Sequence, residues 1–187
     1  MQKETSITHG VKWGIIIGLV YCILLFLRYY QGVSSPIMLT VYVFIGYIIV
    51  LALLLITGIT WKKKLGGYIE MKEAFQTMFI AIIIFELFYT IFNFVYLKYV
   101  NPDFFQKMKD SMETFMQNNH VDQQKIDDAL EKIDVQASKN MNFGSSILSY
   151  AYAVCISGIF ALLFALIIKK KKDPFRTEQD NFLQAQQ

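Results

Sequence analysis

Long apolar stretches alternate with short charged ones along this chain of 187 residues. Four of the apolar stretches carry almost no charge, and they lie at about 11–30, 37–60, 75–97 and 147–168. Each is close to the roughly 20 residues that a helix needs to cross about 30 Å of hydrocarbon. Because lipid offers the backbone no hydrogen-bond partner, an isolated span must be helical. The pattern predicts an all-α, integral membrane four-helix bundle.

The polar segment at about 98–146, before the last span, has a periodic pattern of its own. Asn101 and Pro102 are suited to cap and start a helix. Apolar residues then recur at helical spacing, with a break near His120. These residues are Phe104, Phe105, Met108, Met112, Phe115 and Met116, followed by Ile126, Leu130, Ile133 and Ala137. We expect an extracytoplasmic amphipathic helical hairpin that packs on itself, lies on the membrane or covers one end of the bundle.

Positive charges flank the spans unevenly. Those that fall on one side of a four-span chain are Lys3, Lys12, Lys62, Lys63, Lys64, Lys72, Lys169, Lys170, Lys171, Lys172 and Arg176. The positive-inside rule makes this side cytoplasmic. We therefore expect a transmembrane domain over 1–172, a flexible cytoplasmic tail over 173–187, and both termini in the cytoplasm.

Composition narrows the possible functions. Charged residues make up 18% of the chain, against about 25% in soluble domains, and the bilayer is therefore the first expected partner. The net charge of +3 comes without a basic face bearing aromatic platforms, so we expect no nucleic-acid binding. The histidines His9 and His120 fall on opposite sides of the membrane, and no nucleophile elbow, phosphate loop or HExxH motif is present. We expect neither an enzyme nor a cofactor.

Glu86, near the middle of the third span, is the sharpest candidate for chemistry. A carboxylate at mid-bilayer costs about 3 kcal/mol or more, so such a residue normally faces the bundle interior. Tyr89, Thr90 and Asn93 follow on the same helical face, and Arg28 could reach Glu86 by extending its stem. One interpretation is an intramembrane site for an ion, a proton or a small ligand. The other is an uncharged Glu86 that fixes packing by a hydrogen bond to another helix.

Small residues at four-residue spacing form ridges in the first and last spans. The ridge residues are Gly14 and Gly18 in the first span, and Ser149, Ala153, Ser157 and Ala161 in the last. Such ridges let helix backbones approach closely where lipid removes the hydrophobic drive. They predict either packing of the first span on the last or a homodimer seam.

Met108, Met112, Met116 and His120 also recur at four-residue spacing. Thioethers with an imidazole could hold cuprous copper, and the same methionines could be adaptable filler on the apolar face of a helix. Phenylalanines on the same stripe favour filler, so we expect no metal site.

The loop between the second and third spans, at 64–75, carries a family resemblance. Gly66 and Gly67 suit a tight turn, while Glu70 and Glu73 suit the first turn of a helix. With the four-span order and the long last loop, this segment resembles a family of Bacteroidetes four-span inner-membrane proteins catalogued as a domain of unknown function (DUF 4199). The resemblance covers roughly Thr5 to Lys172. It implies a small protein of the bacterial inner (cytoplasmic) membrane and supplies no activity, cofactor or catalytic residue.

Two functional hypotheses follow. The first is a non-enzymatic membrane subunit or scaffold, which binds a second copy or other membrane proteins through its helix ridges and outer hairpin. The second is a small transporter or an ion- or proton-handling protein that uses Glu86. Four spans with a single acidic residue offer few groups to line a permeation path, which favours the first hypothesis.

Overall fold

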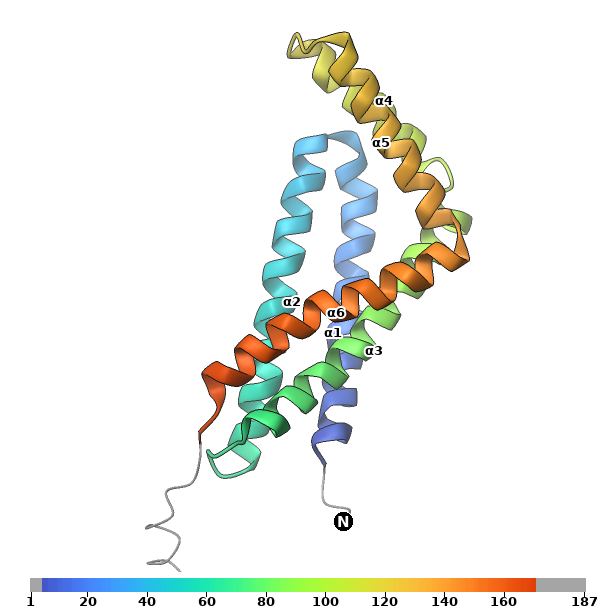
Figure 1. The fold of residues 1–187 in the computed structure, drawn as a ribbon. Helices are drawn as coiled ribbons and strands as arrows, with labels where there is room; N and C mark the ends of the chain where they lie inside the picture. Colours follow the sequence, from blue (N-terminus) through green and yellow to red (C-terminus); the bar gives the residue numbers. More distant parts are fainter. Residues whose placement is uncertain (1–4, 171–187) are drawn as a thin grey trace, which may run out of the picture.

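The computed structural model describes residues 5–170, which fold almost entirely as helices (Figure 1). The four long helices are α1 (Ser6–Gln31), α2 (Pro36–Lys64), α3 (Met71–Val95) and α6 (Phe143–Ile168). The shorter elements are the 3₁₀ turn η1 (Gly32–Ser34), the π-helical turn η2 (Tyr96–Val100), α4 (Phe104–Asn118) and α5 (Gln123–Met141). The predicted tail at 173–187 lies outside the described residues, as do Lys3, Lys171, Lys172 and Arg176.

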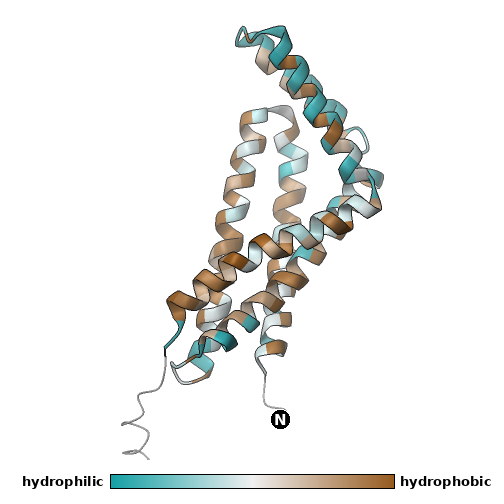
Figure 2. Cartoon of the chain, in the orientation of Figure 1, coloured by the Kyte–Doolittle hydropathy of each residue, from teal (hydrophilic) through white to brown (hydrophobic). Residues whose placement is uncertain are grey.

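Four of the described helices are long and apolar enough to cross a membrane, which confirms the predicted fold class. Their apolar residues stand out in Figure 2, where the hairpin is mostly hydrophilic. Counting η2 with α3, these helices have 26 to 30 residues, more than the roughly 20 that a bilayer requires. They continue past the predicted apolar runs because helical hydrogen bonding does not stop where the hydrocarbon does.

One end of the bundle, here called the lysine end, collects the positively charged flanks. The start of α1, the α2–α3 loop and the end of α6 lie together there (Figure 1). Lys170 and Ile69 exchange two backbone hydrogen bonds of 3.0 Å, and the Lys62 ammonium donates to the Ile168 carbonyl over 2.7 Å. Gly66 and Gly67 turn the chain with φ of 75° and 89°, as their sequence predicts.

The glycines of α1 pack against α3, so the predicted packing of the first span on the last is wrong. A Cβ atom built on Gly14 would lie 2.7 Å from Ile84 Cβ and 2.8 Å from the Ala81 carbonyl oxygen. One built on Gly18 would lie 2.8 Å from Phe88 Cγ. A glycine ridge accepts any helix that can approach it, and here the parallel neighbour α3 takes that place.

Helix α6 packs across α3 and reaches α2 near the lysine end. Ala161 and Ala165 are fully buried in this contact, and the side chain of Ile168 lies against Gly58 of α2. The half of the predicted ridge nearest the lysine end therefore serves packing within the chain.

The polar segment forms the predicted amphipathic hairpin of α4 and α5, which projects from the opposite end of the bundle, here called the hairpin end (Figure 1). Its apolar seam joins the core of the bundle through Phe104, Phe105, Met108, Met112, Leu130, Ile133 and Ala137. Met108 and Met112 thus act as packing residues, as the filler interpretation predicts. Helix α4 begins two residues later than expected, because Asp103 and not Asn101 precedes its first turn.

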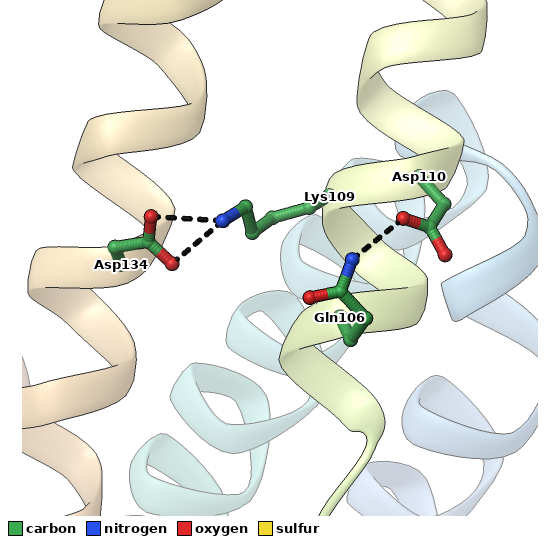
Figure 3. A network of polar contacts seen from close by, with 4 residues as sticks. All are labelled: Gln106, Lys109, Asp110 and Asp134. Atoms are coloured by element: carbon green, nitrogen blue, oxygen red, sulfur yellow. Dashed lines mark hydrogen bonds and ion pairs between the residues drawn. The ribbon is translucent and has the colours of Figure 1, made fainter.

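Polar contacts fasten the outer face of the hairpin (Figure 3). The Lys109 ammonium lies 2.9 and 2.8 Å from the two carboxylate oxygens of Asp134 and so joins α4 to α5. The Gln106 amide donates to Asp110 over 2.8 Å within α4. Exposed pairs of this kind contribute little, so the apolar seam carries most of the hairpin's stability.

Aromatic contacts hold the hairpin against the end of the bundle. The Tyr29 ring of α1 stacks on Tyr96 with 5.0 Å between centroids, and it meets the edge of Phe104 at 4.8 Å. Val33 and Leu39, beside the α1–α2 turn, pack against the same cluster. Of the three predicted positions, the hairpin therefore packs on itself and against one end of the bundle.

Candidate functional site

A cavity of about 750 Å³ lies among the four long helices. Its apolar lining consists of Ile17, Val43, Phe44, Val50, Leu51, Leu54, Ala81, Ile82, Phe85, Ala153, Ile156 and Phe160. Its polar lining consists of Tyr21, Arg28, Tyr47, Glu86, Tyr89, Gln136, Ser149, Tyr152 and Ser157. Twelve of the 21 lining residues are thus apolar, and nine polar residues face the same space.

The cavity opens sideways between α2 and α6. These helices meet at Gly58 and Ile168 near the lysine end, and the cavity lies between them on the hairpin side of that contact. Phe44 and Tyr47 on α2 and Tyr152 on α6 line it, yet they are 64, 60 and 69% exposed. In a bilayer, an opening of this kind faces the lipid and not the water on either side.

Glu86 lies in the cavity wall and is only 5% exposed. Its carboxyl oxygen Oε1 accepts a hydrogen bond of 2.8 Å from the Ser157 hydroxyl of α6. This contact joins α3 to α6 and gives the buried carboxyl the partner that a polar group in hydrocarbon requires.

Arg28 lies in the same cavity wall, but it is not the partner of Glu86 that the sequence suggested. In the part of the chain that the structure describes, no acidic group lies within ion-pair distance of Arg28. Its Nε atom is buried without a hydrogen-bond partner, and its guanidinium carbon lies 5.6 Å from the centroid of the Tyr29 ring.

Tyr21 of α1 and Tyr89 of α3 line the cavity as well. Tyr21 lies edge-on to Phe85 at 5.3 Å and to Tyr89 at 5.7 Å. Since Phe85 precedes Glu86, these contacts place Tyr21 near the level of the carboxyl. Arg28 follows Tyr21 by two helical turns, which is about 10 Å along α1.

The predicted stripe on α3 divides into two parts. Glu86 and Tyr89 line the cavity, whereas Thr90 is half-buried outside its lining. Asn93 connects α1, α3 and the hairpin. It accepts a hydrogen bond from the Tyr29 hydroxyl and donates one of 3.4 Å to Asn140 of α5.

The ridge on α6 divides in the same way. Ser149, Ala153 and Ser157 line the cavity, while Ala161 is buried against the other helices. Of the polar residues that line the cavity, sequence reasoning missed Tyr21, Tyr47, Gln136 and Tyr152. Tyrosine in a span normally sits at the membrane interface, so a phenol far from both ends of a span is a signal that could have identified the three tyrosines.

Comparison with protein families gives one match that covers most of the chain. Residues 12–170 match the model of the family described as "Protein of unknown function (DUF4199)". The chain belongs to this family. The DUF4199 match includes α1 from Lys12 onward, the other three long helices, the hairpin and every residue that lines the cavity. No curated protein and no solved structure matches the chain.

Proposed function

We propose that this DUF4199 protein is a non-enzymatic membrane subunit that works by binding, and that a ligand enters its cavity from the plane of the membrane. The observation that supports this proposal is the lateral cavity itself. Its volume of about 750 Å³ falls in the range of roughly 300–1,000 Å³ typical of ligand pockets, which often lie between the helices of bundles. Apolar walls with a few convergent polar groups are also typical of such pockets.

Filling the cavity should abolish this binding. In Ala153→Phe, a large ring on α6 would occupy the space between α2 and α3. We expect a membrane-derived ligand to remain on the wild-type protein in mild detergent and to be lost from the variant. Native mass spectrometry of the purified proteins measures this difference.

Ile159→Phe is the matched control, because Ile159 lies on the same helix, is 59% exposed and does not line the cavity. Equal ligand retention by wild type, Ala153→Phe and Ile159→Phe would overturn the proposal.

The alternative is an ion- or proton-handling protein, and the burial of Glu86 in the cavity wall favours it. Glu86→Gln separates the two functions. The amide oxygen of glutamine can still accept from Ser157, so a binding subunit should keep its fold and its ligand. A proton carrier would lose flux, because the amide cannot release a proton. We expect no pH-driven flux in proteoliposomes of either protein; flux in wild type that the substitution abolishes would establish the carrier instead.

We also propose that the protein lies in the bacterial inner membrane with its lysine end in the cytoplasm. Lysines near the helix ends that meet there support the orientation: Lys12 in α1, Lys62 in α2, Lys72 in α3, and Lys169 and Lys170 after α6. A fluorescent reporter joined to the C-terminus should then be active in the cytoplasm, and a phosphatase inserted at Asn119 should be active outside it. Reporters that both indicate the same side would contradict this orientation.

A further inference from the structure

Arg28 has no acidic partner among residues 5–170. The guanidinium group lies in the wall of a mostly apolar cavity, its Nε atom is buried without a partner, and no acidic group in residues 5–170 forms an ion pair with it. Arg28 as a whole is half-buried, and a cation that is partly withdrawn from water without a counter-charge is costly. The cation–π contact with Tyr29 offsets part of this cost but supplies no negative charge.

Glu86 does not supply that charge either. Its carboxyl is engaged by Ser157, and it lies near the level of Tyr21, about two helical turns deeper in the bundle than Arg28. The groups that share the cavity with Arg28 at the hairpin end include the Gln136 amide of α5. Gln136 is exposed, so the fixed positive charge at this end of the cavity comes from Arg28, whose guanidinium N–H groups suit an anion.

The rest of the cavity suits a hydrocarbon tail. From Arg28 toward the lysine end, its walls include Val43, Val50, Ile156 and Phe160. A small free anion would leave these walls without contacts, whereas an amphiphile fills them with its tail. The lateral opening between α2 and α6 gives such a molecule a direct path from the bilayer.

We infer that the ligand is an anionic membrane amphiphile, with its acidic headgroup on Arg28 and its tail along the apolar wall between α2 and α6. This inference rests on the proposed function, because it names the class of ligand that the same cavity binds.

The test uses the full chain in nanodiscs that contain phosphatidylcholine and phosphatidylglycerol in equal amounts. After extraction in mild detergent, native mass spectrometry compares the lipid that each protein retains. We expect wild type to prefer phosphatidylglycerol about tenfold, the ratio that one charge-assisted contact of about 1.4 kcal/mol produces. Arg28→Gln should abolish the preference, and Arg28→Lys should keep most of it because the charge remains.

Lys98→Gln is the matched control. Lys98 is a cation at the same end of the bundle, but it lies over the Phe94 ring at 5.0 Å and does not line the cavity. A normal elution volume and melting temperature establish that Arg28→Gln is folded. Loss of the preference in Lys98→Gln as much as in Arg28→Gln would show a general surface effect and overturn the inference.

Three other results overturn it in different ways. Equal retention of both lipids, lost in Ala153→Phe, would leave the proposed function standing but remove the anionic headgroup. Displacement of phosphatidylglycerol by millimolar inorganic phosphate would mean that the anion alone is recognised. A dimer without lipid that Ala153→Phe dissociates would identify a second copy as the occupant. If no variant changes lipid or oligomer, the proposed function fails as well.

Discussion

Gly14→Ala is expected to lower the free energy of unfolding by about 2 kcal/mol, within the range for overpacked interiors. The added methyl group would lie 2.7 Å from Ile84 Cβ and 2.8 Å from a backbone oxygen of Ala81. Neither atom can move unless α3 moves, so α1 and α3 must separate and lose contact along their length. Alanine's better helix propensity, about 1 kcal/mol over glycine, offsets only part of this loss. Unfolding of the purified protein by SDS, followed by circular dichroism, measures the change.

Gly158→Ala makes the same substitution where the neighbour can give way. Its new methyl group would lie 3.1 Å from the ring edge of Phe79, a half-buried side chain that can turn by a few tenths of an ångström. We expect this variant to change the free energy of unfolding by less than half as much as Gly14→Ala. If the two variants were equally stable, the close contact of α1 with α3 at Gly14 would not be present in the protein.

The features that the sequence predicts best are those set by the solvent around each segment. Long runs with almost no charge identify the four spans, because only a helix satisfies its backbone in lipid. The alternation of apolar and polar residues identifies the hairpin, because α4 and α5 have one side on a core and one in water. The ends of the helices were less well placed. Lys62 belongs to α2 although it is charged, since a capped helix continues beyond the hydrocarbon.

Which helix packs on which could not be predicted from local pattern. The ridge at Gly14 and Gly18 shows that one face of α1 meets a backbone closely, but the ridge does not specify whose backbone it meets. The partner depends on how connections and tilts arrange all four spans together. The same limit applies to Arg28 and Glu86: both belong in the bundle interior, but their heights along α1 and α3 keep them apart.

The cavity was harder still to foresee, because it results from the course of α6 relative to α2. Glu86 was identified from its cost in lipid, and Tyr89 from its position one turn later on the same face. Gln136 comes from α5, and its place beside the cavity depends on how the hairpin sits on the bundle. No periodicity in the sequence carries that information.

Tyr29→Ala is expected to release the hairpin from the bundle and to lower the free energy of unfolding by about 3 kcal/mol, as for other buried aromatic truncations. Tyr29 is 4% exposed, and its ring contacts both Tyr96 and Phe104. These two residues belong to η2 and α4, so one side chain of α1 fastens the start of the hairpin. Without this side chain, α4 and α5 still pack on each other through their apolar seam, but the start of the hairpin loses its aromatic contact with α1. Limited proteolysis within the hairpin should become several-fold faster, and SDS unfolding measures the loss of stability.

Tyr29→Phe separates the ring from the hydroxyl. Phenylalanine keeps both aromatic contacts and removes only the hydrogen bond to Asn93, which is worth about 1 kcal/mol. The hairpin of this variant should therefore resist protease nearly as well as that of wild type. If Tyr29→Phe were as sensitive as Tyr29→Ala, the hydrogen bond to Asn93 would hold the hairpin and the stacking would not. Gln136 lines the cavity from α5. If Tyr29→Ala releases the hairpin, Gln136 leaves the cavity wall, and this variant should therefore also retain less ligand than wild type.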